Sequence, residues 1–329
     1  MTSTTDNIAQ NYQLLTAELG HGAFGRVRLG LDKVNQKLVA IKIEDKTKSK
    51  RPSDYLLKAE YKAMIGVGNT EQVLALWEDN RAHYMAMNLL GPSLSHMHKI
   101  CGRTFSLETT LELIRQMIHI SRHHHEAGFL HRDIKPDNYL VDYSIPHRKI
   151  HLVDMGLSKH IEQTNRAPKR HCTRVGSMRY MSPHCHDRIE PSYRDDMYSI
   201  GYVILYFFNG SLPWSADGNG RGDKGVAHES RYDSVATMKR TMSHEQLTEN
   251  VRCWACRRNK VPCSFRGFML QYFNTVAALK FGQRPDYDRI LEDLQACHRN
   301  HGCPEYGSGH PPFPWDWNKY YMIGQGGMT

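Results

Sequence analysis

Short runs that mix apolar, β-branched and aromatic residues with polar ones fill residues 12–90 of the chain. Such runs are typical of β-strands. Five of them are separated by turn-like residues: NYQLLTAEL (11–19), RVRLGL (26–31), KLVAIKIED (37–45), QVLALWED (72–79) and HYMAMNLL (83–90). One helical pattern interrupts them, SDYLLKAEYKAMI at 53–65, in which Leu56, Ala59 and Ala63 recur at helical spacing and Ser53 is a plausible N-cap. The first part of the chain is therefore predicted to be a small, mainly β lobe.

The pattern changes after Gly91-Pro92 to long helical segments. SLETTLELIRQMIHISRHHH (106–125) opens on a capping serine, and RDDMYSIGYVILYFF (194–208) is apolar nearly all round, as a buried helix is. The predicted fold class is α+β with two lobes. Its boundaries are an N-terminal extension 1–11, a β-rich N-lobe 12–87, a hinge 88–92, a mainly helical C-lobe 93–303 and a C-terminal extension 304–329.

Composition predicts the cellular compartment of the protein and the charge of its partners. The N-terminus MTSTTDNIAQ has no signal-peptide pattern, and the longest nearly apolar run, at 198–208, is too short to span a bilayer. We expect an intracellular protein, cytoplasmic or nuclear, without a membrane partner. Eight cysteines in 329 residues indicate reduced thiols rather than a disulfide framework. The net charge of +9 favours anionic partners, and charge alone does not choose among nucleic acid, acidic protein segments and phosphate groups.

The first chemical motif is Gly20-His-Gly22-Ala-Phe-Gly25. Dinucleotide-binding folds use the same spacing, but there the glycines open a helix, whereas here the strand-like RVRLGLD follows. The glycines therefore predict a hairpin over phosphate groups, where backbone N–H groups approach the oxygens. Lys42, in the apolar strand VAIK, needs a partner there, and Glu60 on the predicted helix is the natural one. A solvated edge-strand lysine is the alternative for Lys42 taken alone.

The segment HRDIKPDN at 131–138 places a carboxylate, an ammonium and an amide in one loop, which suits a base, a phosphate contact and a metal ligand. Asp154 follows 21 residues after Asp133, in HLVDMGLSKH at 151–160. Taken alone, Asp154 is better explained as a turn residue before Gly156 than as a metal ligand. Four motifs in this order, each in its expected context, favour phosphoryl transfer.

Together these motifs resemble the eukaryotic protein kinases, over a span from Tyr12 to about Asn318. Five finer segments are similar to the casein kinase I family: LLGPSL (89–94), RDD…SIGYVILYF (194–207), GSLPW (210–214), RPDY (284–287) and PWDWN (314–318). The vaccinia-related kinases carry something similar to LLGPSL and are the near alternative, although they usually alter the loop before the catalytic aspartate.

The resemblance implies a role for each matching residue. Asp133 is the catalytic base, Lys135 contacts the γ-phosphate, and Asn138 and Asp154 bind Mg²⁺. Asp196 braces the catalytic loop. The implied ATP-binding residues are Gly20, Gly22, Gly25, Val27, Ala40, Lys42, Glu60, Met87, Asn88 and Leu90. Among these, Met87 is the gatekeeper behind the adenine, and the backbone of Asn88 and Leu90 bonds to the adenine edge.

The implied function is a monomeric serine/threonine protein kinase that uses ATP and Mg²⁺. Acidic or already phosphorylated protein substrates are expected, because Lys169, Arg170, Arg174 and Arg179 cluster in the peptide-facing segment and Arg179 matches an anion site. The alternative from a different functional class is a pseudokinase scaffold, which binds nucleotide without turnover. The basic stretch KTKSKR at 46–51 permits a nucleic-acid or nuclear-targeting role, but a solvated loop explains it better, so nucleic acid is not expected as a partner. Because the sequence ends soon after PWDWN, the resemblance also implies that no long inhibitory tail is present and that the isolated chain is active.

Three positions depart from the family pattern. Met155 stands where the family has phenylalanine, Asn88 where an acidic hinge residue is usual, and His184 where most kinases have the glutamate that pairs with Arg284. That end of the peptide-binding segment must therefore be held in another way.

Two groups of metal-binding residue types have plainer explanations. Cys253, Cys256 and Cys263 suggest zinc, but half of the paired spacing is missing, so reduced thiols are favoured. The run His123–His125 lies at a predicted helix C-terminus, where cationic and polar side chains are favoured without a metal ion.

Overall fold

A computed structural model of the chain describes residues 4–22, 25–48, 56–69, 72–103, 105–142, 149–161, 166–215, 228–251 and 263–300. The chain divides into two compact units. Unit 1 comprises Met1–Gly91 together with Val153–His160, and unit 2 comprises Pro92–Leu152 together with Ile161–Thr329.

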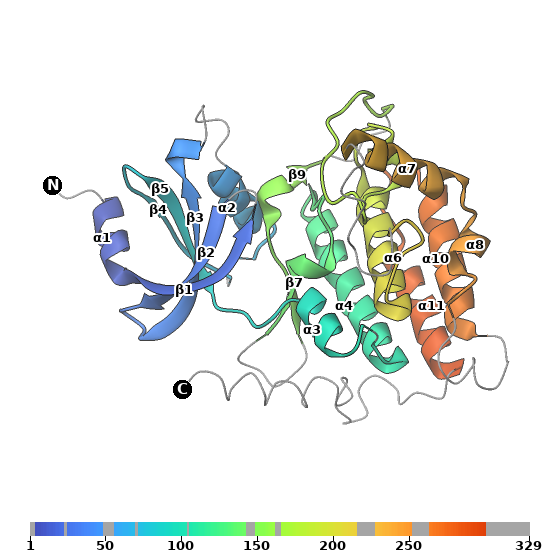
Figure 1. The fold of residues 1–329 in the computed structure, drawn as a ribbon, viewed down its shortest axis with the longest axis horizontal. Helices are drawn as coiled ribbons and strands as arrows, with labels where there is room; N and C mark the ends of the chain where they lie inside the picture. Colours follow the sequence, from blue (N-terminus) through green and yellow to red (C-terminus); the bar gives the residue numbers. More distant parts are fainter. Residues whose placement is uncertain are drawn as a thin grey trace. The chain divides into compact units, whose positions relative to one another are not determined.

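Unit 1 is built on an antiparallel sheet of five strands in the order β1-β2-β3-β5-β4 (Figure 1). The strands are β1 (Tyr12–Gly22), β2 (Gly25–Asp32), β3 (Lys37–Asp45), β4 (Val73–Glu78) and β5 (Ala82–Asn88). All five predicted strands are confirmed, with ends displaced by up to three residues.

The two faces of this sheet are covered differently. On one face Val39, Ile41 and Ile43 of β3 form an apolar cluster with Trp77, and helix α1 (Thr4–Asn11) packs Ile8 and Ala9 against that cluster. The rings of Tyr12, Trp77 and Tyr84 stack on one another at centroid distances of 5.2 and 5.3 Å. Because side chains alternate along a strand, Lys42 and Glu44 point to the other face.

Helix α2 (Leu56–Gly66) lies on the face of Lys42 and Glu44. Its buried residues are Leu57, Glu60, Ala63 and Met64, so the predicted helix is confirmed. The buried face differs from the predicted one, because Ala59 is exposed and Leu56 is only partly buried. The proposed cap Ser53 lies outside the described residues.

Unit 2 is mainly helical in the described ranges. Its longer helices are α3 (Leu94–Ile100), α4 (Leu107–Glu126), α6 (Tyr193–Asn209), α7 (His228–Thr241), α10 (Ser264–Ala278) and α11 (Tyr287–Asn300). Its shorter elements are β6 (Phe129–Leu130), β7 (Tyr139–Val141), β8 (Ile150–Leu152), α5 (Pro183–His186) and α8 (His244–Thr248).

The two helices predicted in this unit are confirmed, and local sequence explains their ends. Ser106 caps α4 by accepting a hydrogen bond from the backbone N–H of Thr109. Helix α6 begins with a capping box formed by Ser192 and Asp195 and ends at Gly210, whose φ of +76° is left-handed.

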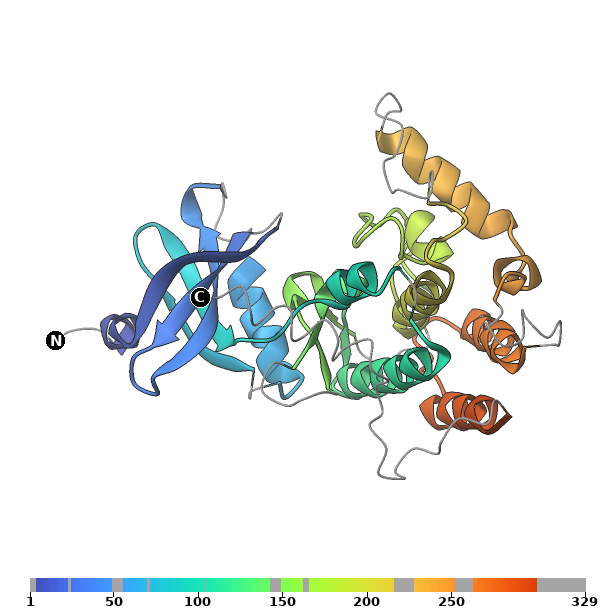
Figure 2. The same cartoon turned by 60° about the horizontal axis from the view of Figure 1, so that its bottom comes forward.

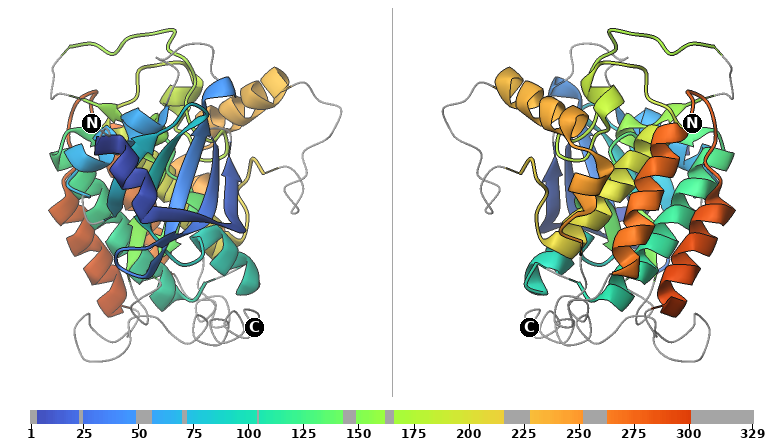
Figure 3. Two further views of the ribbon diagram at one scale, coloured as in Figure 1. Left: turned by 90° about the vertical axis from the view of Figure 1, so that its left-hand side faces the viewer. Right: turned by 90° about the vertical axis from the view of Figure 1, so that its right-hand side faces the viewer.

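Helices α4, α6, α10 and α11 lie side by side in unit 2 (Figures 2 and 3). Helix α6 is buried along nearly its whole length and supplies Tyr202, Val203 and Phe207 to one large apolar cluster. In the described part of the chain, no helix combines the length and the apolar character that a bilayer crossing requires.

Candidate active site

The glycine motif forms the β1–β2 hairpin, as predicted. Gly20 pairs with Val27 and Gly22 with Gly25, while Ala23 and Phe24 lie outside the described residues. Gly25 has a φ of +146°, and a Cβ placed there would lie 2.3 Å from the carbonyl oxygen of Ile43. Only glycine fits so close to the neighbouring strand.

Strand register places the side chains assigned to the nucleotide on one face of the sheet. Val27 is paired with Lys42, and Ala40 with Met87. Since paired residues share a face and alternate residues return to it, Val27, Ala40, Lys42 and Met87 all lie on the face that α2 covers. Asn88 ends β5, and its backbone N–H bonds to Gln72 O at 3.0 Å, while Leu90 follows the strand.

Lys42 joins two carboxylates within unit 1. Its Nζ lies 2.6 Å from Glu60 Oε2 and 2.7 Å from Asp154 Oδ1. Burial alone would lower the pKa of Lys42, but the two carboxylates together raise it above its usual value. Burial raises the pKa of Glu60, and the ammonium of Lys42 opposes that rise. The predicted Lys42–Glu60 pair is therefore present, with Asp154 as a third member.

Asp154 is more than a turn residue. It has left-handed backbone angles (φ 65°, ψ 64°) before the 3₁₀ helix Met155–Leu157, yet its side chain makes no capping bond to that helix. The carboxylate bonds Lys42 instead and is about one-third exposed (33%). Met155, the next residue, is buried, so a flexible apolar side chain fills the slot at this position.

Helix α2 is held at its N-terminus by Glu44, a residue that the sequence analysis did not select. Glu44 Oε1 accepts a hydrogen bond from the N–H of Leu56 at 2.7 Å, and its Oε2 accepts one from Leu57 at 3.1 Å. Glu44 follows Lys42 by two residues on the same face of β3, and Glu60 follows Leu56 by one helical turn. The strand thus holds α2 at two points. The spacing of Glu44 from the helix is a long-range feature with no local sequence signal.

In unit 2, Asp133 is nearly buried and is bonded from two sides. Lys135 Nζ donates to Oδ2, while the N–H and the Oγ of Ser177 both lie 2.8 Å from Oδ1. Asn138 Nδ2 donates to the carbonyl oxygen of Asp133 at 2.9 Å. The structure thus brings together Asp133, Lys135 and Asn138 as predicted. Ser177, which the sequence analysis missed, joins them through a contact across 44 residues.

Asp196 braces this loop from α6. Its Oδ2 accepts the N–H of His131 at 2.8 Å, and its Oδ1 accepts the N–H of Arg132 at 2.9 Å. Burial would raise the pKa of Asp196, but His125 and the backbone N–H groups lower it overall. Arg132 has a φ of +68°, a strained angle that these bonds maintain.

Comparison with family models decides the identity of this fold. The model of the protein kinase domain matches residues 14–260, about three quarters of the chain. The chain belongs to the protein kinases. Members of this family use ATP with a divalent metal ion and take proteins as substrates, and the bilobal α+β fold class is confirmed.

The segment of this kinase that was expected to face the peptide is partly paired with its own α7. Arg174 Nη1 lies 2.6 Å from Glu229, and its guanidinium lies over the ring of Tyr232. Arg174 is therefore paired within the chain, whereas the sequence analysis expected it to face acidic substrates. Arg179 is half-buried, with its guanidinium carbon 6.0 Å from the ring centre of Tyr206.

His184 and Arg284 stand at the positions of the usual kinase ion pair, but each contacts a different residue. His184 Nδ1 lies 3.4 Å from Asp195, and the guanidinium of Arg284 lies over the ring of Tyr193. A hydroxyl–carboxylate bond between Ser182 and Asp195 ties the same segment to α6.

The predicted metal-binding alternatives gain little from the structure. Cys253 and Cys256 lie outside the described residues, and Cys263 is buried before α10. His124 and His125 are buried in the last turn of α4, where His125 contacts Tyr287 and Asp196. Within the described ranges, no three side chains of the His, Cys, Asp and Glu types are grouped as metal ligands would be.

Proposed function

We propose that the chain is an active serine/threonine protein kinase of the casein kinase I type, which transfers the γ-phosphoryl group of Mg-ATP to protein hydroxyls. The observation that carries the proposal is the state of Asp133, whose carboxylate is bonded by Lys135 and Ser177 and whose loop is braced by Asp196. A chain that had lost catalysis would have no need to hold this carboxylate in one orientation. The HRDIKPDN sequence, similar to casein kinase I, supports serine and threonine as acceptors.

Each unit contributes groups suited to the reaction. In unit 1, Lys42 is charged and oriented by Glu60, so it suits the α- and β-phosphates of ATP. In unit 2, Asp133 accepts the proton of the acceptor hydroxyl, and the adjacent ammonium of Lys135 stabilises the charge on the transferred group. Positioning and charge stabilisation supply most of the catalysis in such transfers.

Each unit offers an oxygen donor of a type that a magnesium ion takes. Asp154 offers a partly exposed carboxylate, and Asn138 offers an amide oxygen because its amide nitrogen already bonds Asp133 O. Hard oxygen ligands of this kind are those that Mg²⁺ prefers. When bound, the ion would neutralise the charge of the phosphates.

Transfer of labelled phosphate from ATP to casein and to a basic protein tests the proposal, with Asp133→Asn as the inactive control. We expect phosphate on serine or threonine, and loss of at least about a hundredfold in turnover for the control. Phosphotyrosine as the main product would contradict the acceptor assignment. Nucleotide binding without any transfer would favour the pseudokinase scaffold.

We also propose a preference for acidic or phosphorylated substrates, with Arg179 at the anion site. Contacts between arginine and phosphate are charge-assisted and often bidentate, which supports this role. Arg179→Ala is expected to reduce turnover of a phospho-primed peptide about tenfold more than that of its unprimed form. Steady-state assays on the matched peptide pair test it, and equal losses on both peptides would remove Arg179 from the site.

A further inference from the structure

A buried lysine in α7 holds the backbone of the peptide-facing segment. Lys239 is only 6% exposed, and its Nζ donates to three carbonyl oxygens: Met178 at 2.9 Å, Arg179 at 3.0 Å and Met181 at 2.8 Å. Three of the four polar contacts of Nζ therefore fall on a stretch of four residues, and the fourth is with His186 Nε2 at 3.3 Å.

The surroundings of Lys239 are aromatic rather than acidic. Its Nζ lies 4.9 Å from the ring centre of Tyr202 and 4.7 Å from that of Trp214. No carboxylate among the described residues forms an ion pair with Lys239. Burial lowers the pKa of Lys239 well below its usual value. A buried cation is costly, so the three carbonyl bonds and the aromatic faces must compensate for the lost water.

The segment held in this way connects the catalytic loop to the proposed anion site. Ser177, at its start, bonds Asp133, and the N–H groups of Tyr180 and Met181 both return to Ser177 O, at 2.9 and 3.0 Å. The carbonyl oxygen of Arg179 also accepts the indole N–H of Trp214 at 2.8 Å. The backbone beneath the Arg179 side chain is therefore fixed by two donors, Lys239 and Trp214.

Helix α7 flanks this contact with two further attachments. Arg174 pairs with Glu229 at 2.6 Å, and Asp187 pairs with Arg240 at 2.7 Å (α7 is the gold helix in Figure 3). Both pairs are partly exposed and contribute little on their own. Lys239 is the buried attachment between them.

We propose that Lys239 is a positioning residue for the protein substrate: its ammonium fixes the backbone of residues 178–181, and so sets where Arg179 presents its side chain. This explains how the segment is held although His184 replaces the usual glutamate. The inference rests on the proposed function, since it assigns substrate positioning to a kinase.

The test compares Lys239→Met with Lys239→Arg and with Lys280→Met, a matched change at an exposed lysine of the same unit. For Lys239→Met we expect the KM for peptide to rise at least about tenfold, with the KM for ATP and the slow hydrolysis of ATP without peptide within about twofold of wild type. Lys239→Arg should recover part of the peptide affinity, and Lys280→Met should match wild type. Parallel losses in every parameter and in thermal stability would mean that Lys239 is only structural, which overturns the inference.

Amide hydrogen exchange gives a readout that does not depend on activity. In Lys239→Met the amides of Tyr180 and Met181 should exchange faster, while those of α4 stay protected. If the variant does not fold, Trp214→Phe removes the second donor to Arg179 O but keeps an aromatic ring at this position, and a smaller rise in peptide KM is expected. Unchanged exchange in Lys239→Met, or an unchanged peptide KM in Trp214→Phe, would count against the inference. If the wild type transfers no phosphate, the proposed function fails separately, and exchange still tests the role of Lys239.

Discussion

At the scale of single residues, Lys42 has a double role, because it is both the proposed phosphate contact and the only cation bonded to Glu60 among the described residues. Lys42→Met should abolish transfer and leave the protein folded, since the new side chain has similar length and is apolar. Loss of such an electrostatic group should cost at least about a hundredfold in turnover. Activity within about twofold of wild type would contradict the assignment.

The same variant has a predicted pH dependence. Without Lys42, the buried Glu60 keeps a raised pKa, so the folded state holds a proton that the unfolded state has lost. The free energy of unfolding of Lys42→Met should therefore fall as pH rises through that pKa. Relative to wild type, the variant should be less stable at pH 8 than at pH 5. The double variant Lys42→Met/Glu60→Gln should remove this dependence and remain inactive. Urea unfolding at both pH values measures the effect.

Asp154 and Met155 make different demands at neighbouring positions. Asp154→Asn should cost about 3 kcal/mol of transition-state stabilisation and change the magnesium dependence, because a neutral amide replaces the carboxylate. Met155→Phe should keep activity, whereas Met155→Asp would bury an unpaired charge and inactivate the enzyme. Turnover during a magnesium titration compares the three. An Asp154→Asn protein with normal turnover and normal magnesium dependence would return Asp154 to the role of a turn residue.

At the scale of elements, the attachment of α2 to β3 is the feature to test. Helix α2 has no acidic residue in its first turn, and Glu44 satisfies the N–H groups of Leu56 and Leu57. Glu44→Ala should lower stability by about 1–2 kcal/mol and raise the KM for ATP, because Glu60 loses its fixed position. Glu44→Gln, which keeps an acceptor oxygen, should lose less.

Glu292→Ala, at an exposed position on α11, serves as the control for Glu44→Ala. Thermal unfolding and ATP titration separate the two effects. Loss of stability without any change in the KM for ATP would limit Glu44 to capping the helix.

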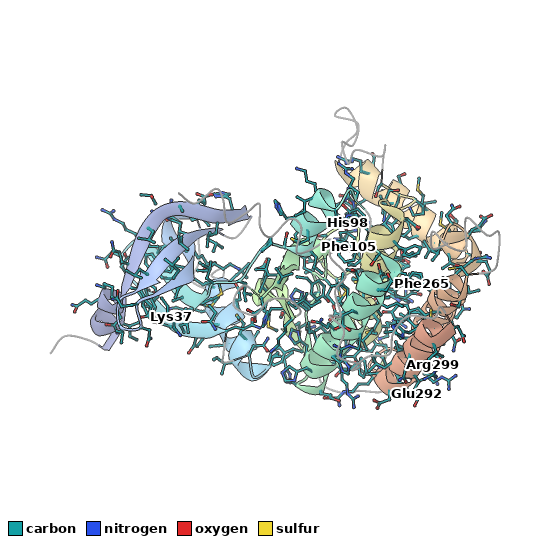
Figure 4. All side chains as sticks on the ribbon, turned by 90° about the horizontal axis from the view of Figure 1, so that it is seen from below. Lys37, His98, Phe105, Phe265, Glu292 and Arg299 are labelled. Carbon is teal, nitrogen blue, oxygen red and sulfur yellow. The ribbon has the colours of Figure 1, made fainter. Side chains whose placement is uncertain are left out.

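At the scale of the whole molecule, buried neutral histidines should set the acid limit of stability. Burial lowers the pKa of His98 to about 4 and those of His124 and His186 to about 3. His98 packs beside Phe105, with ring centres 5.1 Å apart (Figure 4). Each of these histidines binds a proton more readily in the unfolded chain, so stability is complete above about pH 6.5 and falls as pH decreases below it.

For His98 the loss between pH 6.5 and about pH 4 should be on the order of 3 kcal/mol. His98→Gln should flatten this part of the stability curve, whereas His96→Gln, at an exposed position on the same helix, should not. Urea unfolding measured across this pH range tests the prediction. Equal slopes of unfolding free energy against pH in wild type and His98→Gln would mean that His98 does not cause this loss of stability.

Elements with strong periodicity were predictable, and those held by distant contacts were not. The five strands and the helices α2, α4 and α6 follow from alternation, apolar spacing and capping serines. Helix α1 was not predicted, because its sequence TTDNIAQN is mostly polar. Its stabilising contacts are long-range, since Ile8 and Ala9 pack against the sheet. Helix α7 also does not follow from the local sequence. The sequence alone places the charged Lys239 on the surface, whereas in the structure it is buried against distant carbonyl groups.

The sequence by itself determined the order of the five strands and of helices α2, α4 and α6, the glycine hairpin and the residue types of the catalytic loop, because each depends on neighbours within a few residues. Only the tertiary structure decided that Asp154 shares Lys42 with Glu60 across 112 residues, that Ser177 bonds Asp133, and that Lys239 holds the Arg179 backbone. These contacts join side chains far apart in the chain, and local preference carries no record of such partners. A buried charge is stable only beside a specific partner, and folding alone brings that partner to it.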